Sequence, residues 1–167
     1  MVHHLIDSLR KKLNLNIYSV NEVKMFEIHI KYKSPPNSDD LDLVLSEFLL
    51  DIGYINERET MDMESIKKSI PYRLFKEVFL LRPDKKWLVD EMLVYLGTTK
   101  PTLYRYLNRL KALDILQEEL AGKEKSYSLR YNSLSAAWMF VENNVKMAMD
   151  NYRKTIGLIE KLAGEKK

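Results

Sequence analysis

The sequence has no cysteine and only three histidines. Without thiols the chain can form neither disulfide bonds nor thiolate metal sites, and this composition favours a reducing, cytoplasmic setting. His3, His4 and His29 are too few and too scattered to predict a metal site. We therefore expect no metal and no cofactor.

Sequence patterns of catalysis and of membrane insertion are also missing. The chain contains no glycine-rich phosphate loop, no nucleophile elbow and no paired-carboxylate signature, so we predict that it is not an enzyme. No apolar run approaches the roughly 18 residues that a membrane span requires, and the N-terminus lacks the basic and apolar regions of a signal peptide. We therefore expect a soluble protein without a membrane partner.

Charge is present but unevenly distributed along the chain. The 167 residues suit one or two small domains, and 46% apolar residues suffice for a core. Residues 1–70 hold 9 basic and 12 acidic side chains, residues 71–131 hold 12 and 8, and residues 132–167 hold 6 and 4. The middle segment is the electropositive one, as a phosphate-binding module should be.

Within that segment, residues 100–113 have the pattern of a helix with two different faces. Thr98 or Thr99 is expected to cap its first turn, where Pro101 is tolerated. One face is apolar and predicted to be buried, because leucines recur on it at intervals of four, three and three residues. These leucines are Leu103, Leu107, Leu110 and Leu113.

The other face of this helix is basic, since no acidic residue lies between Lys100 and Asp114. Arginine and asparagine can make paired hydrogen bonds to guanine and adenine edges in the major groove, so Arg105 and Asn108 are the predicted base readers. The simpler alternative is the solvated face of an amphipathic helix. The residues predicted to contact bases and flanking phosphates are Lys100, Thr102, Tyr104, Arg105, Asn108 and Arg109.

Two short strand-like runs follow, residues 115–120 and 126–131, on either side of a charged turn at 121–125. Apolar and polar residues alternate in the second run, which predicts a hairpin with only one packed face. Lys123 and Lys125 lie in the turn, and we predict that they contact the DNA backbone.

Helices are predicted before this segment as well. A broad apolar stripe indicates a helix over residues 41–52, ended near Gly53. Residues 54–63 have weak periodicity and are expected to be a connection. Residues 63–81 are helical in pattern, with Pro71 either kinking the helix or starting a new one.

A very short strand is predicted at residues 87–88 and a helix at 90–96, which Gly97 ends. Gly97 and the two threonines then form the short turn that a helix-turn-helix uses. With this order of elements, residues 72–131 resemble the winged helix-turn-helix domains of ArsR- and MarR-type transcriptional regulators. The residues that carry the resemblance are Val89-Asp90-Glu91-Met92, Leu96-Gly97, residues 102–110 and Ile115-Leu116.

The resemblance implies a regulator that places the helix over residues 100–113 in the major groove of double-stranded DNA. Two features depart from the family. Many such domains have glycine between the recognition helix and the first wing strand, whereas this chain has Leu113-Asp114 there. The cysteine-based metal box of many ArsR-type sensors has no counterpart, which excludes metal sensing by thiolates.

The C-terminal residues 133–163 predict a helix of roughly 45 Å. Its apolar residues recur every three or four positions, as in a seam between paired helices, and we predict that it forms a homodimer. The alternative is packing against the N-terminal segment of the same chain. The predicted dimer residues are Leu134, Trp138, Val141, Val145, Ala148, Tyr152, Ile156 and Ile159.

The N-terminal region is predicted to contain a short helix over residues 2–12 and two alternating strands, residues 13–17 and 26–32. Its role is open between an effector pocket, a dimer arm and a surface for a protein partner. In the strand predicted over residues 26–32, the exposed polar face consists of Glu27, His29 and Lys31.

The complete prediction is an α+β fold, mostly α, in three parts. These are an N-terminal α/β segment (residues 1–68), a winged helix-turn-helix domain (69–131) and a long C-terminal helix (132–167). The predicted function is sequence-specific binding of double-stranded DNA by a homodimeric transcriptional regulator. The alternative is a winged-helix protein-protein interaction module in a larger assembly.

Overall fold

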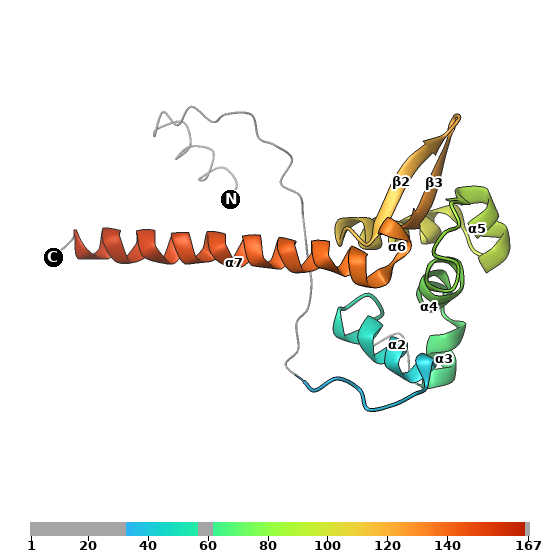
Figure 1. Cartoon of the computed structure of the whole chain (residues 1–167), viewed down its shortest axis with the longest axis horizontal. Coiled ribbons are helices and arrows are strands. Elements are labelled where there is room, and N and C mark those ends of the chain that lie inside the picture. The colour runs from blue at the N-terminus through green and yellow to red at the C-terminus, as the bar shows by residue number, and fades with distance from the viewer. Residues whose placement is uncertain (1–32, 57–61, 166–167) are drawn as a thin grey trace, which may run out of the picture.

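The computed structural model describes residues 33–56 and 62–165. The elements predicted over residues 2–32, with the three histidines and the polar strand face, lie outside the described residues. The described part is mostly helical, with a small antiparallel sheet of three strands and a long C-terminal helix (Figure 1), which confirms the α+β, mostly α class. In chain order the elements are α2 (Leu41–Asp51), α3 (Met63–Lys68), α4 (Ile70–Arg73), the π-helix η2 (Leu74–Leu80), β1 (Trp87–Leu88), α5 (Val89–Leu96), α6 (Lys100–Ala112), β2 (Leu116–Ala121), β3 (Glu124–Leu129), the 3-10 turn η3 (Arg130–Asn132) and α7 (Leu134–Gly164).

Helix α2 forms where its sequence pattern predicts. Its first turn is capped by Asp40, whose carboxylate accepts a hydrogen bond of 2.8 Å from the backbone N–H of Asp42. After its last turn, Gly53 takes a left-handed φ of 71°, which costs glycine little. The Asp42 carboxylate accepts a hydrogen bond of 2.6 Å from the Tyr72 hydroxyl, and this bond links α2 to α4.

Pro71 starts a new helix, which resolves the alternative left open by the sequence. Ser69 has extended backbone, with ψ 145°, and so separates α3 from α4. Its hydroxyl oxygen accepts a hydrogen bond of 3.4 Å from the N–H of Tyr72. Pro71 lies in the first turn, where no intrahelical N–H is lost. Helix α4 continues into the π-helix η2, which the sequence pattern did not distinguish from an α-helix.

Strands β2 and β3 have six residues each, as predicted, but their bounds are shifted and their turn is tighter than predicted. The strand order is β1-β3-β2, so β3 is the central strand. Ala121 pairs with Glu124, which leaves Gly122 and Lys123 as the two turn residues instead of the five expected. Gly122 has a φ of 68°, the left-handed conformation that a two-residue turn demands.

The prediction of a single packed face on the hairpin is wrong for β3. Tyr127 and Leu129 point one way and are buried, but Ser126 and Ser128 on the other face are buried too. Strand β3 lies between β1 and β2, and Lys86, which precedes β1, forms an ion pair with Glu119 on β2. The ion pair therefore spans the serine face of β3.

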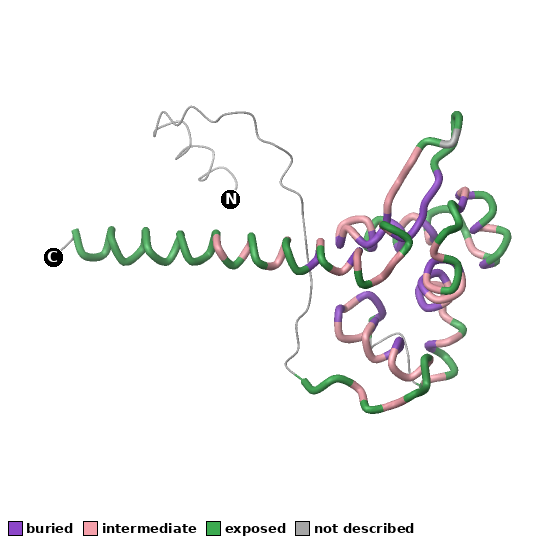
Figure 2. Tube along the Cα trace, in the orientation of Figure 1, coloured by how far each residue is buried: buried purple, intermediate pink, exposed green. Residues whose placement is uncertain are grey.

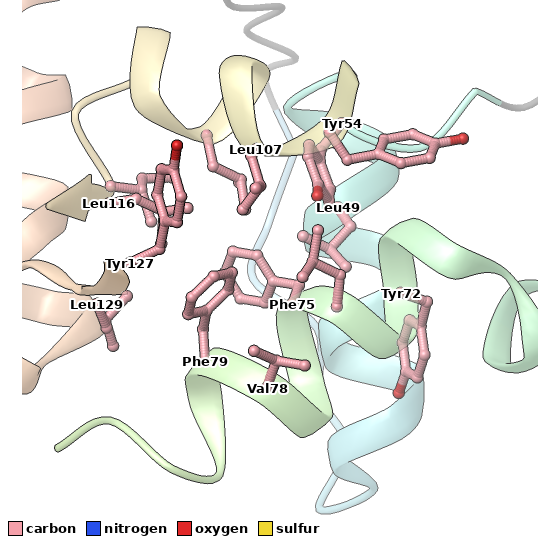
Figure 3. Close-up of a cluster of buried hydrophobic side chains, with 14 of the residues drawn as sticks. Leu49, Tyr54, Tyr72, Phe75, Val78, Phe79, Leu107, Leu116, Tyr127 and Leu129 are labelled. Atoms are coloured by element: carbon pink, nitrogen blue, oxygen red, sulfur yellow. The ribbon is translucent and has the colours of Figure 1, made fainter. Parts of the chain in front are cut away.

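One hydrophobic core joins α2, η2, α6 and the sheet (Figure 3). Phe75 of η2 is 1% exposed and lies near its centre. Its ring centroid is 6.4 Å from that of Phe48 on α2 and 6.1 Å from that of Tyr54. Leu107 brings α6 into the same core, and Ala137 and Val141 bring in the beginning of α7.

Asp114 joins the end of α6 to α7. It has a φ of 60°, a left-handed conformation that glycine adopts more easily than other residues. Its carbonyl oxygen accepts a bond of 2.9 Å from Arg130 Nε. Its carboxylate accepts one of 3.0 Å from Asn144 Nδ2 on α7. The departure from glycine therefore supplies a carboxylate that orients the long helix.

Helix α7 has 31 residues, as predicted for a long C-terminal helix, and projects away from the rest of the fold (Figure 1). Its first turns are held by the core and by Phe140, whose ring stacks on Tyr131 with centroids 5.7 Å apart. Every residue from 151 to 165 is exposed (Figure 2). The far half of α7 thus makes little contact with the described part of its own chain.

Candidate nucleic-acid interface

Helix α6 buries its leucine face and turns its basic face outward. Leu103, Leu107 and Leu110 are fully buried, as their spacing predicts, and Leu113 is buried just after the helix. Proline in the first turn is also confirmed. The predicted threonine cap is wrong, because the Thr99 hydroxyl donates to Thr102 Oγ1 at 3.0 Å instead of accepting a backbone N–H.

The six predicted contact residues on α6 differ in exposure. Lys100, Arg105, Asn108 and Arg109 are exposed. Thr102 and Tyr104 are half-buried, and Tyr104 packs against the core. The outward face is therefore dominated by three cations and one amide.

The tertiary structure brings the beginning of α6 and the tip of the hairpin together. Between them and α5 lies a cleft of about 230 Å³. Four of the eight predicted DNA-binding residues line it, with three lysines at its edges. The lining residues are Lys100, Tyr104, Lys123, Lys125, Val89, Asp90 and Glu124. Lysines from α6 and from the hairpin can hold a phosphate group, although the carboxylates of Asp90 and Glu124 reduce the positive potential.

Several of the predicted cations are bound within the chain. Arg109 donates to the Gly53 carbonyl oxygen, and its guanidinium lies 5.7 Å from the Tyr54 ring centroid. Arg105 donates to the Tyr106 hydroxyl at 2.7 Å and lies 4.6 Å from that ring centroid. Both arginines are thereby held in fixed positions, and Arg109 is turned toward the end of α2.

Lys125 is also engaged, through an ion pair of 2.7 Å with Glu118 on β2. By contrast, the side chains of Lys100, Asn108 and Lys123 make no hydrogen bond or ion pair with any described residue. These three are therefore available to a partner without breaking an internal contact. Sequence reasoning missed the role of Glu118, because the pairing of β2 with β3 and α6 is not visible in the local pattern.

No family model matches this chain, and a search of curated proteins finds no match either. The site is therefore described by its geometry alone. Among residues 33–56 and 62–165, no three His, Cys, Asp or Glu side chains form a group that could hold a metal ion. Within the same residues, no helix combines the length and the hydropathy needed to cross a bilayer.

Glu118 gives the site a pH-dependent contribution to stability. Hydrogen bonds from Lys111 and Lys125, and then from the Tyr127 hydroxyl, lower the pKa of Glu118 from 4.5 to about 2. A carboxyl whose pKa is lower in the folded state stabilises the fold above its unfolded pKa and loses this effect as the pH falls.

We therefore expect the melting temperature of the protein to fall as the pH is lowered from 4.5 toward 2, and to fall less in a Glu118→Gln variant. Melting curves followed by circular dichroism at several pH values measure this. The matched control is Glu124→Gln at the exposed end of the same hairpin, which should melt like the parent chain at every pH. An unchanged pH profile in Glu118→Gln would contradict the role of the Lys111–Glu118–Lys125 cluster.

Proposed function

We propose that residues 69–131 form a winged helix-turn-helix and that the protein binds double-stranded DNA sequence-specifically as a homodimer. In this proposal α6 is the recognition helix and the β2–β3 hairpin is the wing. The supporting observation is the position of Lys123 at the hairpin tip beside Lys100 at the beginning of α6, on either side of one cleft. This arrangement offers phosphate-binding cations next to an exposed helix face.

The size and chemistry of α6 suit the major groove. A helix with its side chains is about 10 to 12 Å wide, and the major groove of B-DNA is about 12 Å wide. Arg105 and Asn108 are exposed on α6, three residues apart, and so lie on one side of the helix. They are the proposed base readers, whereas Lys100 and Lys123 contact phosphates. Arg109 positions α6 on α2 instead of reading bases.

The homodimer part of the proposal rests on the far half of α7. Tyr152, Ile156 and Ile159 are 66%, 56% and 60% exposed and recur at helical spacing. A stripe of large apolar side chains on a projecting helix is typical of a surface that pairs with another helix. A two-fold dimer would present two copies of α6 to one palindromic site.

A salt titration tests DNA binding directly. Fluorescence anisotropy of a labelled random duplex would give the affinity at several salt concentrations. If six or more phosphates are contacted, the affinity should fall by roughly a thousandfold or more between about 50 and 200 mM salt. The same titration with a duplex selected from a random pool gives the specific affinity. Absence of binding at low salt would favour the alternative of a protein-interaction module. The observation on the side of this alternative is that Arg109 and Lys125 are engaged within the chain, which makes the exposed surface less basic.

Replacing Arg105 with alanine should cost about 1 to 3 kcal/mol in binding free energy on the selected duplex and relax the preference at one base pair. Arg105→Lys is the matched control, because it keeps the charge but loses the paired hydrogen bonds of the guanidinium. Lys123→Ala should weaken binding to selected and random duplexes alike. Equal losses on both duplexes for Arg105→Ala would refute its assignment as a base reader.

A further inference from the structure

The side of α7 that is free for a partner keeps five of the eight predicted dimer residues but excludes Leu134, Val141 and Ala148. Ala137 and Val141 are 0% and 1% exposed in the core of their own chain, so Val141 is not available to a second copy. The residues that continue the free side at alternating intervals of three and four are not buried. We name these residues the α7 seam: Ser135, Trp138, Glu142, Val145, Met149, Tyr152, Ile156 and Ile159.

The spacing of the α7 seam is that of a coiled coil. Intervals of three and four give a period of 3.5 residues, which keeps one line of side chains toward a partner helix when two helices supercoil. The seam runs for 25 residues, or about 37 Å at 1.5 Å per residue, which is three and a half heptads. The last four residues of the seam are all large, apolar and exposed, with Tyr152 at 66% and Ile159 at 60%.

The near end of the seam lies in a groove between α2 and α7. This groove has a volume of about 390 Å³ and is lined by Phe48, Leu134, Ser135, Trp138 and Glu142. Three of these five residues belong to the seam. Phe48 and Trp138 form its apolar wall, with ring centroids 5.2 Å apart in an edge-on arrangement. The groove is large enough to receive side chains from a second helix.

We propose that two copies of the protein pair through their α7 seams in antiparallel orientation, so that the far end of each seam fills the groove of the other copy. This inference rests on the homodimer part of the proposed function. In the antiparallel register that we propose, the residue numbers of two facing positions sum to 294. Every seam residue of one copy then faces a seam residue of the other copy. The facing pairs are Val145 with Met149, Glu142 with Tyr152, Trp138 with Ile156, and Ser135 with Ile159, each from opposite copies.

Glu142 decides between the two orientations. It is the only charged residue in the seam. In a parallel pair, the Glu142 carboxylates of the two copies face each other, which opposes association. In the antiparallel pair, each Glu142 faces a Tyr152, whose hydroxyl can donate a hydrogen bond to the carboxylate. The apolar wall of the groove then receives Ile156 and Ile159. The antiparallel register thus removes the repulsion and covers the exposed apolar residues of both copies.

Cysteine cross-linking of the full chain tests the register, and the absence of native cysteine makes the result unambiguous. The informative variant carries both Ser135→Cys and Ile159→Cys. The two new cysteines of one chain are 24 residues apart on one helix, about 36 Å, so they cannot bond to each other. The matched controls are the two single variants, in which identical cysteines of an antiparallel pair are also about 36 Å apart. Mild oxidation, non-reducing electrophoresis and the mass of the unoxidised protein are the measurements.

We expect the double variant to give at least about tenfold more covalent dimer than either single variant, because only facing cysteines come within disulfide distance. Efficient cross-linking of Ile159→Cys alone would indicate a parallel pair and overturn this proposal, while leaving the homodimer in place. A dimeric mass without cross-linking of the double variant would place the interface elsewhere and also overturn it. A monomeric mass for the unmodified chain would overturn both this inference and the homodimer, and would leave DNA binding to be judged by the salt titration.

Discussion

Replacing Phe75 with alanine is expected to lower the free energy of unfolding by about 3 to 5 kcal/mol, the usual loss for a large aromatic side chain in a core. Phe75 is 1% exposed and contacts aromatic rings on both sides, Phe48 on α2 and Tyr54 beyond it. Its removal leaves a cavity where α2, η2 and α6 meet (Figure 3). The π-helix that carries it has little freedom to close this cavity, because Leu74 and Val78 are also fully buried.

Urea unfolding followed by circular dichroism measures this loss. The matched control is Val94→Ala on α5, whose side chain is 85% exposed and which should change the free energy of unfolding by no more than about 0.5 kcal/mol. A loss below about 1 kcal/mol for Phe75→Ala would mean that the core does not close around this ring. A changed dependence on urea concentration would indicate that unfolding is no longer a single transition.

Replacing Ile156 with aspartate is expected to weaken the proposed homodimer by roughly a hundredfold or more. Burying an isoleucine side chain contributes about 1.5 to 3 kcal/mol, and a two-fold dimer loses it twice, so the total is about 3 kcal/mol or more. A tenfold change in affinity corresponds to about 1.4 kcal/mol. Affinity for a palindromic duplex should fall as well, because the two DNA contacts are no longer linked.

The control for this variant lies two residues away. Leu158 is 55% exposed, close to the 56% of Ile156, but lies on another side of α7, away from the seam. Leu158→Asp therefore introduces the same charge without removing the contact, and should leave the dimer intact. Sedimentation at several protein concentrations compares the two, and melting curves should show the body of both variants folded as in the parent chain. Equal effects of the two substitutions would show that the seam is not the dimer interface.

The sequence alone was sufficient for the elements whose patterns are local. The leucine spacing of α6, the glycine that ends α5 and the short strand at Trp87 were all predicted and are all confirmed. Periodicity and end signals depend on neighbouring residues along the chain, so they can be recognised without tertiary structure. The basic face of α6 was visible for the same reason, and four of its six predicted residues are exposed.

The tertiary structure decided which of those residues already make contacts within the chain and which are available to a partner. Arg109 binds the end of α2, Lys125 binds Glu118, and Val141 lies in the core of its own chain, although each matched its predicted pattern. These contacts join positions as far as 56 residues apart, and local periodicity carries no information about such pairs. The buried serine face of β3 was also missed, because β3 is flanked by β1 and β2, and the pairing of β1 with β3 is not visible in the local pattern. The sequence by itself thus determined the helices, the strands and the faces they present, whereas only the packing of distant segments determined which face remains available for a partner.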